Sequence, residues 1–136
     1  MNVNSNNDRL EQFFYSARIF KYILQRTNRD FVDLVQVNAQ FGKEGLLFII
    51  KTAQARLSAS IYWIDNTVVP EGMQESFDVI KMTFEGASLL LEEMLLNINL
   101  QKEKELQNNL LQAMAIAKET YEHIKVFEFL NNTTKG

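Results

Sequence analysis

A single proline, Pro70, stands almost at the middle of this 136-residue chain. Proline has no backbone N–H and its ring clashes with the preceding helical turn, so it breaks a helix interior but is accepted at a helix start. Glycine is also scarce, with five residues, and apolar residues recur at helical spacing on both sides of Pro70. Because β-rich folds need many turns that draw on Gly and Pro, the sequence predicts an all-α protein of a few long helices.

The most regular pattern of the chain lies directly after Pro70. Its apolar residues alternate steps of four and three from Met73 to Ile98: Met73, Phe77, Ile80, Phe84, Ala87, Leu91, Met94 and Ile98. This seven-residue repeat puts them on one helix face and is typical of long helices packed side by side. We therefore expect a helix over this range, followed by a turn at Asn97-Ile98-Asn99.

Three other segments show the same spacing less regularly. We expect a first helix from about Asp8 to Gln40, a second from Leu46 to Ile64 and a last one from about Leu100 to Leu130. Their expected core faces are Leu10, Phe13, Ala17, Phe20, Leu24, Thr27, Phe31 and Leu34; Leu46, Ile50, Ala53, Leu57, Ser60 and Ile64; and Leu106, Leu110, Ala113, Ala117, Thr120, Ile124 and Phe127. Short connections favour antiparallel neighbours, so the predicted fold is an up-down-up-down four-helix bundle.

Two boundaries of this bundle depend on local capping signals. Gly42 can adopt the positive φ that commonly ends a helix. The sequence leaves open whether the first helix is broken near 27–30, because Thr27 and Asn28 are good N-caps and no Gly or Pro enforces a break. We expect one domain over residues 8–130, with polar flexible tails at 1–7 and 131–136.

Composition limits the classes of function. Without cysteine there is no disulfide, catalytic thiol or cysteine metal site. The polar N-terminus lacks the apolar region of a signal peptide and no apolar run is long enough for a membrane span, so we expect a cytoplasmic protein with no membrane contact. The net charge of −3 argues against a nucleic-acid partner, because phosphate backbones require a basic surface.

Residues that carry chemistry are sparse. His123 is the sole histidine, and a di-iron bundle would need two Glu-x-x-His motifs, whereas position 120 is Thr. Glu85 and Glu92, one heptad apart, could hold a hard cation or act as acid and base, although a polar outer face explains them as well. We therefore expect no catalytic residue, no metal site and no cofactor.

Charge is divided unevenly about Pro70. Residues 1–69 hold eight Lys and Arg against six Asp and Glu, including all five arginines, whereas residues 70–136 hold six against eleven. Two interpretations remain open. Either the two halves attract each other within one bundle, or the charged surfaces steer a partner or a second copy.

Aromatic residues exceed what one core stripe can hold. Three consecutive aromatics, Phe13-Phe14-Tyr15, spread over about 200° of helix, so they cannot all face the core. Such residues are enriched at interfaces, which makes these side chains candidate interface residues: Phe14, Tyr15, Tyr62, Trp63 and Phe129. A wide core that encloses them is the alternative.

Alanines recur near the middle of three predicted helices, at Ala53, Ala87, Ala113 and Ala117. In an up-down bundle they should lie at one level, with Phe20 and Tyr22 of the first helix beside them. Those aromatics either fill the layer or leave an apolar pocket for a small ligand or a partner's helix.

These features together predict a non-catalytic helical protein-interaction module, such as an adaptor, a chaperone-like or a regulatory protein. Its expected partner is another protein or a second copy of itself, with a homodimer favoured. The alternative function is a small apolar-ligand binder that uses the alanine-lined layer. A carboxylate-based metalloprotein or enzyme is less favoured.

Overall fold

The computed structural model describes the backbone of residues 2–69 and 72–135, and the side chains of residues 15–36, 42–69 and 72–126. The chain forms α1 (Asn2–Asn66), α2 (Gln74–Asn99) and α3 (Glu103–Lys135). Gly42 interrupts α1 with φ 66° and ψ −156°, a conformation that is essentially restricted to glycine. We call the two parts of α1 arm 1 (2–41) and arm 2 (43–66).

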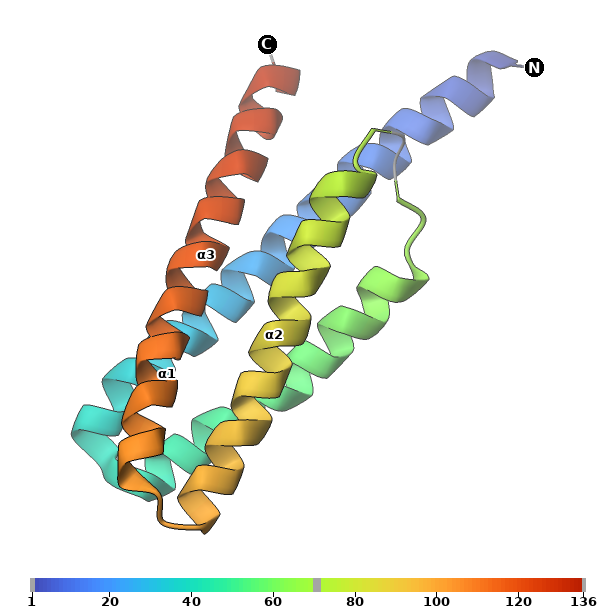
Figure 1. The fold of residues 1–136 in the computed structure, drawn as a ribbon. Coiled ribbons are helices and arrows are strands. Elements are labelled where there is room, and N and C mark those ends of the chain that lie inside the picture. The colour runs from blue at the N-terminus through green and yellow to red at the C-terminus, as the bar shows by residue number, and fades with distance from the viewer. Residues whose placement is uncertain (1, 70–71, 136) are drawn as a thin grey trace.

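The two arms, α2 and α3 run in alternating directions, and consecutive segments lie side by side (Figure 1). Polar contacts join each neighbouring pair: Arg56–Asp30 between the arms, Lys81–Asp65 between α2 and arm 2, Asn97–Asn109 between α2 and α3, and Asn28–Ala117 between arm 1 and α3. In this cyclic order arm 1 and α2 occupy diagonal corners, as do arm 2 and α3, which Lys43 and Glu103 join at one end of the bundle. The predicted all-α, up-down-up-down four-helix bundle is confirmed.

The core forms where the heptad pattern places it. On α2 the seam from Phe77 to Ile98 is buried, and Met73 is half-buried against it. Most of the other core residues come from the predicted faces of the arms and α3: Phe20, Leu24, Phe31, Leu34, Leu46, Ile50, Ala53, Leu57, Ile64, Leu106, Leu110, Ala113 and Ile124. Ile23 and Leu90 are also buried, although neither lies on a predicted face. Helical spacing was thus sufficient to identify which side of each segment faces inward.

Arm 1 passes through residues 27–30 without a break. Thr27 is buried on the core side instead of capping a new helix, and the Asn28 side chain bonds to α3. The first and last helices also extend closer to the chain termini than predicted: α1 begins at Asn2 and α3 ends at Lys135. The division into tails and one domain stays a prediction.

The turn between α2 and α3 lies later than predicted. The helix continues through Asn97 to Asn99, and the chain reverses over Leu100, Gln101 and Lys102. Gln101 has a left-handed φ of 57°, and the Lys102 amide donates to the Asn97 carbonyl oxygen. Asn97, which resembles a turn residue in sequence, stays helical because its side chain bonds to Asn109 in the core. Pro70 lies outside the described residues.

Candidate functional site

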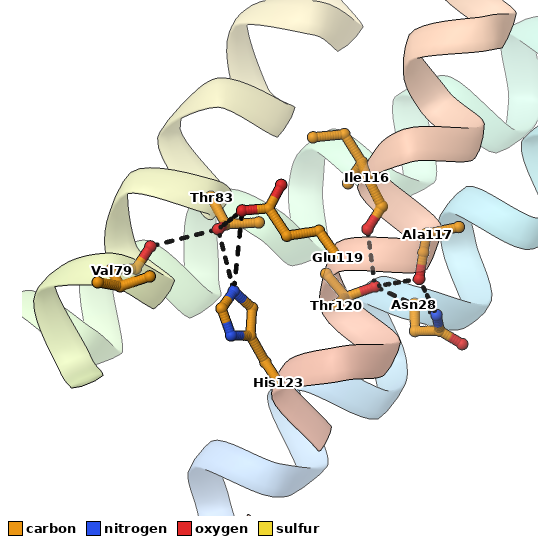
Figure 2. A network of polar contacts seen from close by, with 8 residues as sticks. All are labelled: Asn28, Val79, Thr83, Ile116, Ala117, Glu119, Thr120 and His123. Carbon is orange, nitrogen blue, oxygen red and sulfur yellow. Dashed lines mark hydrogen bonds and ion pairs between the residues drawn. The ribbon is translucent and has the colours of Figure 1, made fainter. Parts of the chain in front are cut away.

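A compact group of polar side chains lies where α2 meets α3 (Figure 2). The Thr83 hydroxyl donates to Oε1 of Glu119 at 2.7 Å, and Nε2 of His123 lies 3.3 Å from Thr83 Oγ1 and 3.9 Å from the same Glu119 oxygen. A hydroxyl has a single hydrogen, which the shorter contact assigns to Glu119. Thr83 therefore accepts from the Nε2–H of His123, a tautomer inferred from this network.

This geometry suits a link between helices better than a nucleophile and its base. Thr83 is 5% exposed and therefore has little access to a substrate. The Thr83 hydroxyl and the Glu119 carboxylate instead bond to each other across the two helices. Within the described side chains, no group of three or more His, Asp or Glu is placed to hold a metal ion. Thr83, Glu119 and His123 thus tie α3 to α2.

A shallow cavity of about 230 Å³ opens beside this cluster. Its lining residues come from the first turns of α2 and from α3: Glu75, Ser76, Val79, Ile80, His123 and Val126. Small-molecule pockets commonly measure roughly 300–1,000 Å³ and enclose most of the ligand. This cavity is smaller than that range, and the exposed Val79 and Val126 form part of its rim.

The alanine layer is placed differently from the prediction. Ala53, Ala87 and Ala113 are buried and Ala117 is half-buried. The Asn28 side chain donates to the Ala117 carbonyl oxygen at 2.6 Å, so residues near 28 mark the level of the layer on arm 1. Phe31, three residues further along arm 1, is a large buried side chain close to that level.

Phe20 and Tyr22 do not belong to that layer. Phe20 lies eight residues before Asn28, about 12 Å along the helix. Its ring packs 4.1 Å from Phe77 and 5.8 Å from Trp63, measured between centroids. Tyr22 is 62% exposed and therefore cannot line an interior pocket. The prediction overlooked that Phe20 packs against the start of α2, far from its middle.

The candidate interface residues have different surroundings. Tyr15 and Tyr62 are exposed, as expected for available contact surface. Trp63 is half-buried and its ring makes a T-shaped contact with Phe20, so it belongs to the border of the core. The side chains of Phe14 and Phe129 lie outside the described residues.

A second apolar row, which sequence reasoning missed, runs along the outer face of α2. We call its members the α2 outer row: Val79, Met82, Leu89, Leu96 and Leu100, which are 45–70% exposed. These residues follow alternating steps of three and four, and the two intervening positions of that pattern hold Gly86 and Glu93. The pattern was visible in the sequence, offset from the core seam, but the stronger seam obscured it.

Acidic residues follow this row along the helix. Asp78, Glu85 and Glu92 are exposed and one heptad apart, so they lie together beside the row. Glu75 and Glu93 are also exposed, but they lie in line with the row itself. We call Asp78, Glu85 and Glu92 the acidic edge. Lys81 lies 4.0 Å from Glu85, but its shorter contact is with Asp65 of arm 2.

No protein-family model, curated protein or solved structure matches this chain. In the part of the chain that the structure describes, no helix combines the length and apolar content needed to cross a membrane. The surface of the bundle is therefore the basis for a functional proposal.

Proposed function

We propose that this protein is a non-catalytic helical interaction module and that the α2 outer row is its docking surface. The observation that carries the proposal is the alignment of large exposed apolar side chains on one helix face, with Met82, Leu89 and Leu96 spaced one heptad apart. Single exposed apolar residues are ordinary on protein surfaces, whereas an aligned group of them marks a contact surface.

A helix is the partner that fits this surface best. Heptad-spaced apolar side chains can pack into the gaps between side chains on another helix of similar periodicity. The acidic edge lies on the outside of such a contact and would favour a partner with cationic flanks. A second copy of the chain is the first candidate, with a homodimer as the smallest assembly. A cytoplasmic location, suggested by the cysteine-free composition, is part of the proposal.

Site-specific photo-crosslinking tests this proposal in cells that produce the protein. A photoreactive phenylalanine analogue at position 89 should give a discrete adduct, because Leu89 lies in the middle of the row. The same analogue at Phe48 is the matched control, since Phe48 on arm 2 is 70% exposed and Leu89 is 66% exposed. Absence of any discrete adduct at 89, or the same adducts at both positions, would contradict the proposed docking surface.

A further inference from the structure

Charge is segregated between the two diagonal corners of the bundle. The outer surface of arm 1 carries Arg18, Arg26 and Arg29 around two exposed aromatic residues, Tyr15 and Tyr22. We call these five residues the arm 1 row. The outer surface of α2 presents apolar side chains beside the acidic edge. One corner is therefore cationic and aromatic, and the other is acidic and aliphatic.

From this complementarity we infer that arm 1 of a second copy is the occupant of the α2 outer row. The inference rests on the proposed function, in which that row is a docking surface. Tyr15 and Tyr22 are one heptad apart, the same spacing that separates Leu89 from Leu96. Two helices with matching repeats can pack side by side over several turns, with arginines of one beside carboxylates of the other.

None of the ion pairs between described residues joins the arm 1 row to the acidic edge. Between described residues, three ion pairs connect different helical segments: Arg56–Asp30, Lys81–Asp65 and Lys43–Glu103. None of them joins arm 1 to α2. Arg29 pairs with Asp33 of its own helix at 3.5 Å, a contact that is largely exposed. The uneven charge of the sequence thus leaves two complementary surfaces directed away from each other.

The position of these surfaces determines the kind of assembly. A two-fold symmetric dimer needs both patches on the same face, whereas arm 1 and α2 lie at opposite corners. Each contact between copies therefore leaves an unused arm 1 row on one copy and an unused α2 outer row on the other. A dimer is the first product, and further copies extend it into a chain or close it into a ring.

Two single substitutions separate the two halves of the contact. Leu89→Asp blocks the α2 outer row but leaves arm 1 intact, and Tyr22→Asp does the reverse. Both side chains are exposed, so the fold should be retained, as circular dichroism and thermal unfolding would verify. Phe48→Asp on arm 2 is the matched control. We expect each row variant to weaken self-association by about tenfold or more, and the control variant to behave as the wild type.

Mixing the two row variants tests directly whether arm 1 of one copy binds the α2 outer row of another. The intact arm 1 of Leu89→Asp can bind the intact row of Tyr22→Asp, so light scattering should show a 1:1 dimer that does not grow with concentration. Wild-type oligomers should grow with concentration and shrink as salt is added, because the flanking charges are exposed. A monomeric wild type, or a mixture that stays monomeric, would overturn the inference.

Other outcomes distinguish failure of this inference from failure of the proposed function. If Tyr22→Asp associates as the wild type does while Leu89→Asp does not, the row pairs with itself and the arm 1 assignment is wrong. If the wild type is monomeric but position 89 crosslinks to a different protein, the docking surface remains and its occupant is not a second copy. If neither self-association nor a crosslink occurs, both proposals fail.

Discussion

The side-chain amide of Asn97 donates to Oδ1 of Asn109 across 2.6 Å, with both residues buried between α2 and α3. The Asn109 amide in turn donates to Oε1 of Gln112 at 3.2 Å. This buried bond favours one alignment of the helices, because a shift by one residue would leave the Asn97 amide without its acceptor. The pair thus sets the register of α2 against α3 close to the turn.

Replacing Asn109 with Leu should therefore lower the free energy of unfolding by about 1–3 kcal/mol, since Asn97 would keep a buried amide without an acceptor. Urea unfolding measures this loss. In the double variant Asn97→Leu/Asn109→Leu, much of the stability should return, because neither buried amide remains. Equal stability of the single variant and the wild type would show that the pair contributes no specific constraint.

Gly42→Ala should destabilise the bundle by about 1–3 kcal/mol through backbone strain. Beyond the local backbone, nothing lies within 4 Å of an added Cβ, so the cost does not come from a clash with a packed neighbour. It comes from the backbone conformation of φ 66° and ψ −156°, which alanine rarely adopts. Gly86→Ala is the matched control. Gly86 also has open space around a Cβ but lies inside α2, where alanine should stabilise by about 0.5–1 kcal/mol. Thermal unfolding should shift in opposite directions, and a shared direction would refute this account.

Asp30 should give an unusual pH dependence. Burial raises the pKa of its carboxyl above 3.8, and the Arg56 guanidinium at 2.6 Å offsets this in part. The Asp30 carboxyl of the folded state therefore binds a proton more tightly than that of the unfolded state. The contribution of Asp30 to stability falls as pH rises from 3.8 through the raised pKa of the folded state. In urea unfolding at a series of pH values, the wild type should gain stability relative to Asp30→Asn as pH falls from neutral toward 3.8. A gain in the opposite direction would be inconsistent with a raised pKa.

Ala87→Leu tests whether the alanine layer is filled. Ala87 is fully buried, and added methyl groups in a close-packed layer should cost about 1–3 kcal/mol. The exposed Ala55 on arm 2 is the control, because leucine there meets solvent. A neutral or stabilising effect at Ala87, measured by urea unfolding, would instead indicate an apolar cavity. Such a cavity would support the alternative function of binding a small apolar ligand.

Much of the fold could be predicted because helix formation and facing depend on local spacing. The seam from Met73 to Ile98 and the faces of the other segments were identified from steps of three and four alone. The glycine break at Gly42 followed from backbone sterics, which depend on that residue itself. Asn97 was misjudged because a turn-forming side chain can remain helical when a partner on another helix satisfies it.

The candidate site was less predictable because it depends on how the segments are placed relative to one another. Spacing alone predicted the buried seam of α2, but it did not show that the apolar side chains of the outer row stay exposed. The distribution of charged residues along the sequence also showed an arginine-rich first half and an acidic second half. It did not show that their surfaces would lie at diagonal corners of the bundle. The sequence by itself determined four inward-facing helical segments, since that information is local. Only the tertiary structure decided which apolar and charged surfaces remain without a partner, because exposure is set by contacts between residues far apart in the chain.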